Sequence, residues 1–444
     1  MTGVAQPAGP ASLSLSEAIE LALKDYPAIR ESRARAHAAE EGVGVARTAY
    51  LPRLDVLWQE NRATRNNVFG LLFPQAIVPQ VSGPVLGTTS YDSVWGSAAG
   101  MLLSWEAVDF GRRKATVDVA RAQTSFATAQ NELTQLDVAA AAADAFLTVL
   151  AADETVRAVR ANVDRLQVFA ESVRVLVRNQ LRPGVDEARA EAELAMARNQ
   201  LTQAVQAAEI ARADLAEAIG AAGTAVNLDP APLTILPELP APATTSVQMH
   251  PAARAGSAAL ETVRARQRVL DRSYRPRLDV QSVVAGRSVA DAPGQPAQGN
   301  GLTPQVPNWA VGISVTFPVF DVFSVNARRR VELDNEAAER ARYDHTIQRL
   351  TTTVARARAL MTAAAEIARN TPAERTAATQ AERQARARYT SGLASVTEVA
   401  DAERLLAQAE ADDAVARLGV WRALLAASQA RGDLTPFLDK VRHP

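Results

Sequence analysis

Two periods of apolar residues divide the chain into segments of different character. Long segments repeat their apolar side chains at alternating steps of three and four residues, whereas shorter segments alternate apolar and polar side chains one by one. The first period is typical of helices packed lengthwise, and the second of strands with one apolar face. The pattern therefore predicts long helices together with a small set of strands.

The helical period is most extended between Arg112 and Arg182, where neither glycine nor proline occurs. At ~1.5 Å per residue this run could reach about 105 Å, far beyond the roughly 10–14 residues of an average globular helix. Its apolar positions keep heptad spacing, with one phase slip, at Leu133, Leu136, Ala140, Ala143, Leu147 and Leu150, and then at Val156, Val159, Val163, Leu166, Ala170, Val173 and Val177. A second helix is expected over 185–219, and a comparable rod over about 326–390.

The alternating period is clearest over residues 308–317, a length that suits a membrane-spanning strand. Looser alternation predicts three further strands at about 52–65, 91–105 and 276–287. Four of the five tryptophans lie in these strands, as membrane-interface aromatics would: Trp58, Trp95, Trp105 and Trp309. A soluble sandwich explains the alternation equally well. Four strands cannot close a barrel, so the membrane interpretation requires several chains to pool their strands.

An internal duplication organises the chain. The segment Tyr50–Val56 returns as Tyr274–Val280, and Asp109, Asp186 and Glu191 return as Asp321, Glu398 and Glu403. Each copy contains a helix (about 14–48 in the first), two strands and a long helical hairpin. The predicted organisation is an N-terminal tail (1–12), a first repeat (13–228), a Pro-rich linker (229–246), a second repeat (247–436) and a C-terminal tail (437–444).

Composition removes several classes of function. The 48 Lys and Arg residues against 49 Asp and Glu, with a net charge of -1, argue against a nucleic-acid binder. The absence of cysteine excludes disulfides, zinc thiolates and a cysteine nucleophile. The four histidines, His37, His250, His345 and His443, form no metal-binding or catalytic spacing, and no phosphate-binding loop is present. The sequence therefore predicts no catalytic, cofactor or metal site.

The sequence gives little indication of a transmembrane helix or of a signal peptide. No uncharged apolar run reaches the roughly 18–20 residues of a transmembrane helix, and the most apolar stretch, 139–152, contains Asp144. Residues 1–11 lack the basic and apolar regions of a signal peptide. Either the protein stays in the cytoplasm, or its signal peptide is absent from this sequence.

The motifs and their order resemble the TolC-type outer-membrane efflux proteins, the outer membrane factors of tripartite pumps. The resemblance covers about residues 13–436 and rests on Leu103–Arg113 with its weaker copy Val315–Asp321, on the strand starts Leu51–Leu54 and Arg275–Leu278, and on the tip segments 181–194 and 389–406. It implies a mainly α fold with a small β part, in which long antiparallel helices form a trimeric α-barrel. Four strands per chain would be pooled into a twelve-stranded transmembrane β-barrel.

The implied function is a passive exit duct of a tripartite efflux or type I secretion system. A homotrimer in the outer membrane, with a long periplasmic extension, would contact outer-membrane lipid and be opened by a periplasmic adaptor and an inner-membrane pump. No cofactor and no nucleic acid is implied. The alternative is a soluble periplasmic coiled-coil adaptor or interaction protein. The cargo, whether drug, metal or protein, stays open.

Two acidic residues match the family's pore constriction. Glu398 and Asp401 are three residues apart after the second tip turn, so they share one helical face. The resemblance implies a ring of six carboxylates in a trimer, which would attract cations. The alternative is a solvated acidic first turn, which the helix dipole favours.

The tips carry the other implied sites. Tyr389 and Asp186 match the latch that closes the tunnel, while Ala394 stands where some members have arginine, so Arg182 or Arg178 is a candidate substitute. Adaptor docking is expected at the two turns, with a plain solvent-exposed loop as the alternative, through Leu181, Pro183, Gly184, Ser391, Gly392 and Leu393. Outer loops are expected at 69–89 and 291–307. The apolar first loop would either cap the pore or rest on lipid.

Overall fold

The computed structural model describes residues 12–64, 66, 70–80, 87, 89–230, 233, 235–237, 246–290 and 300–442. The predicted N-terminal tail (1–12) lies outside this range except for its last residue, as do parts of the linker and of both outer loops. The chain forms two compact units. One combines residues 37–125 with 258–340 and contains the strands, and the other combines the remaining segments and contains the larger part of each helical hairpin.

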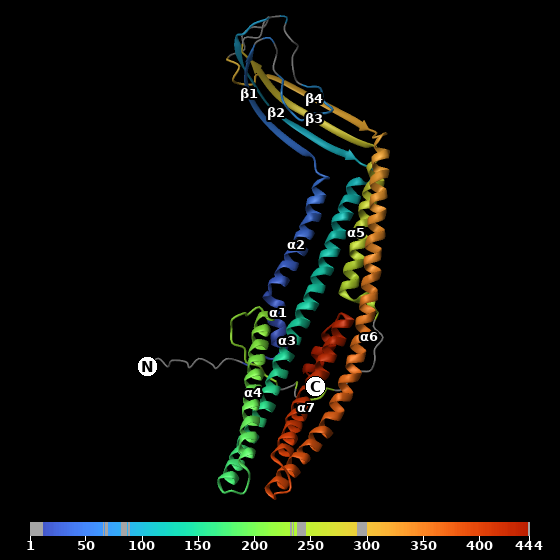
Figure 1. Ribbon diagram of the computed structural model, residues 1–444. Helices are drawn as coiled ribbons and strands as arrows, with labels where there is room; N and C mark the ends of the chain where they lie inside the picture. Colours follow the sequence, from blue (N-terminus) through green and yellow to red (C-terminus); the bar gives the residue numbers. More distant parts are fainter. Residues whose placement is uncertain are drawn as a thin grey trace, which may run out of the picture. The chain divides into compact units, whose positions relative to one another are not determined.

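Four antiparallel strands form one sheet in the order β1-β2-β3-β4, so the prediction of four strands per chain is confirmed (Figure 1). They are β1 (Arg53–Thr64), β2 (Ser93–Val108), β3 (Arg277–Val289) and β4 (Val306–Thr316). The register places Leu54 opposite Leu103, Met101 opposite Val284, and Val284 opposite Trp309. The outer edges of β1 and β4 have no strand partner among the described residues.

The two faces of the sheet differ in chemistry, because successive strand residues point to opposite sides. On one face the large apolar side chains are exposed: Leu54, Val56, Trp58, Met101, Leu103, Trp105, Val284, Trp309, Val311, Ile313 and Val315. We call this the apolar face. The other face carries smaller and polar residues such as Gln59, Ser104, Gln281 and Ser314. We call it the polar face.

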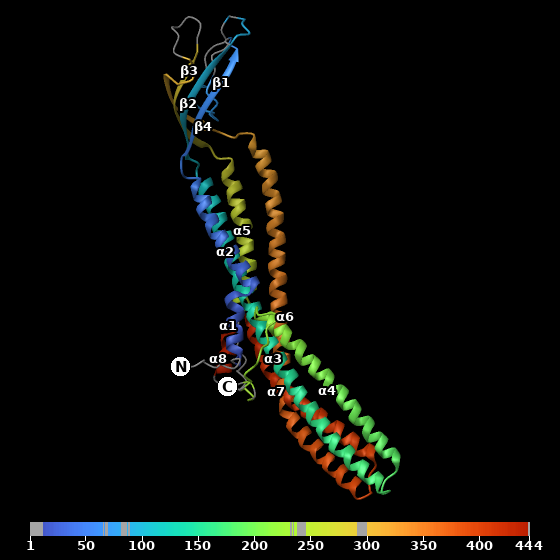
Figure 2. The same ribbon diagram turned by 90° about the vertical axis from the view of Figure 1, so that its left-hand side faces the viewer.

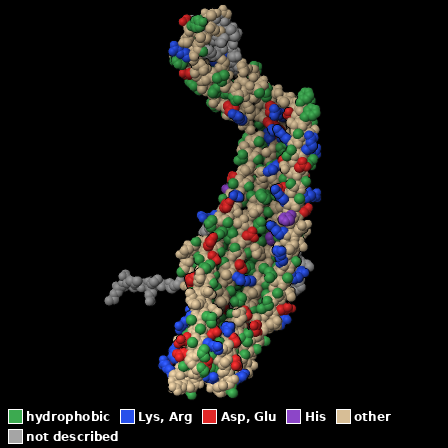
Figure 3. Space-filling view, in the orientation of Figure 1, with side chains coloured by type: hydrophobic (Ala, Val, Ile, Leu, Met, Phe, Trp, Pro, Cys, Tyr) green, Lys and Arg blue, Asp and Glu red, His purple; other side chains and the backbone are tan. Residues whose placement is uncertain are grey.

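Helices α2 (Pro27–Thr48), α3 (Arg112–Arg178), α5 (Pro251–Ser273) and α6 (Asp321–Thr390) connect to the strands (Figure 2). The other unit contains α1 (Leu15–Asp25), α4 (Gly184–Ala218), η2 (Val247–Met249), α7 (Val396–Arg431) and α8 (Thr435–Arg442). In both views α3 and α4 form one antiparallel hairpin, and α6 and α7 form a second. On the face drawn in Figure 3, acidic, basic and hydrophobic side chains are interspersed along the helices. Buried Phe146, Leu215 and Trp421 belong to the main core of this unit.

Two sequence predictions need correction. The single helix expected over about 14–48 is two helices, because Pro27 has no N–H to continue α1 and instead begins α2 at the position where proline is favoured. Residues 437–442 are not a tail. They belong to α8, whose Phe437 and Val441 are buried, with the Phe437 ring 6.3 Å from that of Trp421.

Helix α3 is long, and part of it is apolar enough in composition to cross a membrane. It is the only described helix with these properties, and 56% of its most apolar window is buried within the protein. Burial of this extent is what the core helix of a bundle also shows, since such a helix packs against neighbours on most sides.

Candidate functional site

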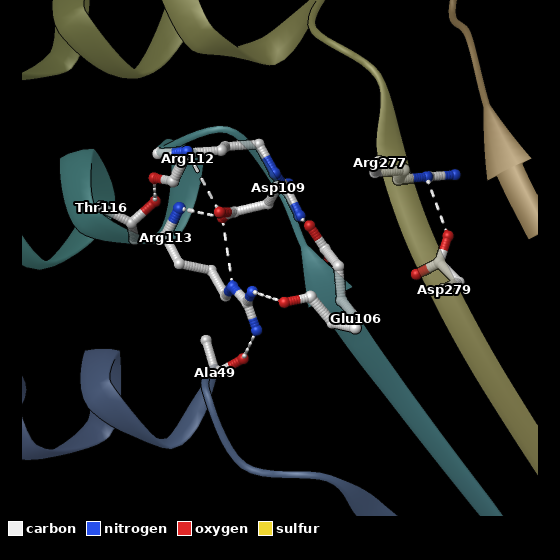
Figure 4. A network of polar contacts seen from close by, with 10 residues as sticks. Ala49, Glu106, Asp109, Arg112, Arg113, Thr116, Arg277 and Asp279 are labelled. Atoms are coloured by element: carbon white, nitrogen blue, oxygen red, sulfur yellow. Dashed lines mark hydrogen bonds and ion pairs between the residues drawn. The ribbon is translucent and has the colours of Figure 1, made fainter.

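A cluster of polar contacts stabilises the turn between β2 and α3, and it gives residues of the motif Leu103–Arg113 a structural role (Figure 4). We call it the turn cluster. Phe110 and Gly111 both have positive φ angles, 50° and 95°, which reverse the chain sharply. Asp109 then accepts hydrogen bonds from the backbone N–H groups of Gly111 (3.1 Å) and Arg113 (2.5 Å). Burial alone would raise the pKa of Asp109, but these N–H groups and the Arg113 guanidinium hold it below its usual range.

The turn cluster also binds the segment that leads into β1. The Arg113 guanidinium bonds the carbonyl oxygens of Ala49 and Ala107, each at 3.3 Å, and lies 4.8 Å from the Tyr50 ring centre. The indole N–H of Trp105 donates to the Tyr50 carbonyl at 3.1 Å. In the second copy Val325 occupies the position equivalent to Arg113. The second repeat therefore lacks the arginine of the turn cluster.

Glu398 and Asp401 lie in the first turns of α7, and both side chains are exposed. Glu398 forms a capping box with Ser395, since each backbone N–H donates to the other's side chain at 3.3 Å. Asp401 pairs with Arg404 at 2.5 Å. Each carboxylate therefore has a local role within the chain, and both stay accessible to a neighbouring copy or to ions.

Two of the three predicted latch residues, Arg182 and Tyr389, are in direct contact. Tyr389 is 1% exposed, the Arg182 guanidinium lies 4.4 Å from its ring centre, and Arg182 donates to the Tyr389 carbonyl. Burial first, and the Asp186 carboxylate second, raise the pKa of the Tyr389 hydroxyl. Within the described part of the chain this hydroxyl has no hydrogen-bond partner. The structure thus brings Arg182 and Tyr389 together, with the Asp186 carboxylate close enough to act on the Tyr389 hydroxyl.

The two tip turns present apolar side chains to solvent. Leu181 and Leu393 are both exposed. Gln180 and Gly392 have positive φ angles of 59° and 78°, which end α3 and α6. Pro183 precedes Gly184, the first residue of α4, and the Ser391 hydroxyl bonds the Ala387 carbonyl at 3.0 Å. These residues form two compact, accessible loops.

The four tryptophans predicted for the membrane interface all lie on the exposed apolar face. Trp58, Trp95, Trp105 and Trp309 are on strands β1, β2 and β4, and each is more than one-third exposed. The Arg62 guanidinium lies 5.6 Å from the Trp95 ring centre. This arrangement is a cation–π contact, in which the guanidinium is attracted to the face of the indole ring.

A buried ionic cluster lies near the tips, and the sequence patterns did not predict it. Glu403 on α7 is 0% exposed and accepts hydrogen bonds from Arg165 of α3 (3.0 Å) and from Arg386 of α6. Arg165 also pairs with Glu410 at 3.0 Å, and Arg386 with Glu382 at 2.7 Å. Burial raises the pKa of Glu403, and the two arginines oppose that shift. We call these five residues the hairpin cluster.

The repeat contained a signal for half of this cluster. At the spacing that relates the copies, Arg174 and Glu191 correspond to Arg386 and Glu403, and both pairs are in contact. The position equivalent to Arg165 is Ala377, so the repeat does not reveal the third helix. Among the described side chains, no group of three or more His, Asp or Glu residues could hold a metal ion.

Comparisons with known proteins agree with this arrangement. The family model described as "Outer membrane efflux protein" matches residues 18–221 and 245–433. Protein CyaE of Bordetella pertussis is 28% identical over 277 residues, which are 60% of this chain. The matched part is 53% of CyaE, so the chain spans about half the length of that relative.

Solved channels share the fold. The CusC structure has a TM-score of 0.79 at 15% identity, covering 97% of this chain and 95% of that one. The outer membrane channel CmeC of Campylobacter jejuni has 0.78 at 15% identity, covering 97% and 89%. The open MtrE channel of Neisseria gonorrhoeae has 0.74 at 21% identity, covering 94% and 89%. With the family model matching most of its length, the chain belongs to the outer membrane efflux protein family.

Proposed function

We propose that this chain is the passive exit duct of a tripartite efflux or type I secretion system and works as a trimer in the outer membrane. The observation that carries the proposal is the sheet, whose apolar face is exposed along all four strands and whose two edges have no strand partner in the part of the chain that the structure describes. Unpaired backbone groups are unfavourable in hydrocarbon, so such a sheet requires neighbours at both edges. Three copies would supply them by closing a twelve-stranded barrel.

The long hairpins support the rest of the proposal. Helices α3 and α6, of 67 and 70 residues, are each about 100 Å long at ~1.5 Å per residue. That length suits a periplasmic tunnel that an inner-membrane pump reaches through an adaptor. Cell fractionation tests the proposal against a soluble periplasmic adaptor. A heat-modifiable trimer in the outer-membrane fraction is expected, and a soluble periplasmic monomer would contradict it.

We propose that Glu398 and Asp401 form a carboxylate ring at the tip of the trimer. Their exposure on one side of α7 supports this, because exposed carboxylates on one helical face can line a common axis. Changing both to alanine removes six charges from the trimer. We expect higher single-channel conductance in planar bilayers and weaker block by multivalent cations. Changing exposed Glu209 of α4 to alanine is the control, and equal effects in both variants would refute the ring.

The tip turns are proposed as adaptor docking sites, with Tyr389, Arg182 and Asp186 as the latch beside them. Exposed Leu181 and Leu393 support docking, since burying an apolar side chain against a partner removes apolar surface from water. We expect that Leu181→Asp with Leu393→Asp abolishes pump-dependent resistance and leaves the trimer intact. Resistance that survives the double change would place docking elsewhere.

A further inference from the structure

The segment 70–80, which follows β1, lies on the polar face of the sheet. Leu71, Phe73 and Val78 are buried there in one cluster with Ala98, Leu102, Val283 and Ala285. The neighbouring Leu72 points away and is 77% exposed. The segment therefore has its own apolar anchor on the side of the sheet opposite the exposed apolar face.

Two glutamines of the sheet bind the backbone of this segment. Gln59 of β1 donates to the Gly70 carbonyl (2.7 Å) and accepts from the Leu72 N–H (3.0 Å). Gln281 of β3 accepts from the N–H groups of Ala76 (3.2 Å) and Ile77 (3.0 Å). The Gln281 amide also donates to the Ser104 hydroxyl at 3.2 Å, so its oxygen is oriented toward the segment.

The sheet is shaped to let the segment come close. A Cβ atom on Gly312 of β4 would lie 2.8 Å from the Cγ2 atom of Ile77, which is nearer than side chains tolerate. Gln281 is 8% exposed, and both polar atoms of its amide form hydrogen bonds. The oxygen accepts from the segment, and the nitrogen donates to Ser104 of the sheet. Glutamine buried in this way is satisfied only while the segment stays in place.

We infer that residues 70–80 form a constriction inside the lumen of the duct, held by Gln59 and Gln281, which limits the size of solutes that pass its outer end. This inference rests on the proposed function, because the apolar face must contact lipid for the polar face to line the lumen. Three copies would place three such segments around one axis. The constriction is separate from the proposed carboxylate ring, since the strands and the tips belong to different units.

The placement is tested by cysteine labelling of the intact trimer in outer-membrane vesicles, which is clean because the chain contains no cysteine. Leu72→Cys should react with a small, membrane-impermeant maleimide and lose reactivity as the maleimide becomes bulkier. Val56→Cys, equally exposed but on the apolar face, should react only with a lipid-soluble maleimide. Reaction of Val56→Cys with the impermeant reagent would contradict the proposed function itself. Leu72→Cys reacting only with the lipid-soluble reagent would overturn the constriction alone.

The role is tested by conductance in planar bilayers. Because the two constrictions would act in series, Gln59→Ala with Gln281→Ala is compared on a background of Glu398→Ala with Asp401→Ala. We expect a roughly twofold rise in conductance and permeation by larger polyethylene glycols, as removal of a lumen constriction predicts. Gln305→Ala, an exposed glutamine outside the segment, is the control. Conductance and polymer limits that match the control would overturn the inference, and a trimer that forms normally excludes misfolding as the cause.

Discussion

His250 is held by both of its ring nitrogens. Nδ1 accepts a hydrogen bond from the Ala252 N–H at 3.1 Å, and Nε2 donates to the Gln429 carbonyl at 3.2 Å. Only the neutral ring satisfies both contacts, because a proton on Nδ1 would face another N–H group. Burial, acting first, lowers the pKa of His250, and Arg349 acts in the same direction, whereas the Gln429 carbonyl and Asp137 oppose it.

The free energy of unfolding should therefore depend on pH through His250. Its pKa is lower in the folded state than the unfolded value of about 6.5, so the unfolded chain binds more protons in the window below 6.5. Stability is present above pH 6.5 and is lost as the pH falls through the window. His250→Asn keeps an acceptor for the Ala252 N–H and cannot titrate. We expect thermal unfolding between pH 7.5 and 5.5 to vary less in this variant than in the wild type.

Asp137 also contributes to the pH dependence of stability. The quantity to measure is therefore the difference between the pH profiles of the wild type and of His250→Asn. Burial, its largest influence, raises the pKa of Asp137 above 3.8 against the effects of Gln429, His250 and Arg349. Its contribution falls as the pH rises from 3.8, which is the opposite direction to that of His250. Parallel pH profiles for the wild type and His250→Asn would show that the ring does not titrate in the folded state as described.

At the scale of the helices, Arg165 connects the two hairpins of the chain. It lies on α3 and pairs with Glu403 and Glu410, both on α7. Its removal leaves a buried carboxylate with Arg386 as its remaining basic partner in the cluster, and breaking a buried pair in this way costs about 3–5 kcal/mol. We expect Arg165→Ala to lower the free energy of unfolding by about this amount, measured by denaturant titration of the detergent-solubilised protein.

Arg174 supplies the matched control for that change. It pairs with Glu171, Glu187 and Glu191, all within the first hairpin, and most of these partners are well exposed. Exposed pairs contribute about 0–1 kcal/mol, so Arg174→Ala should have a small effect. Equal losses in the two variants would mean that burial between hairpins adds nothing to the Arg165 contacts.

Local patterns predicted the elements better than they predicted the contacts between them. The heptad and alternating periods of rods and strands are visible within a short window, so they identified four strands and both hairpins. The burial of Glu403 and the position of residues 70–80 depend on partners far along the chain. Ile77 and Gln281, for example, are 204 residues apart. A carboxylate in a helical repeat, or an apolar loop, carries no local mark of such a partner.

At the scale of the whole molecule, the proposed function assigns the apolar face of the sheet to contact with lipid. Val311 is exposed on this face of β4, whereas Ser314, three residues later, lies on the polar face. An arginine facing lipid at the bilayer midplane costs about 2–4 kcal/mol per chain, and lumen positions tolerate charge. We expect Val311→Arg to reduce the heat-modifiable trimer in outer membranes sharply, and Ser314→Arg to leave most of it, as measured on unheated gels. In the proposed trimer, three chains contribute to one barrel, so the penalty would triple. Equal trimer yields in the two variants would mean that the apolar face does not contact lipid.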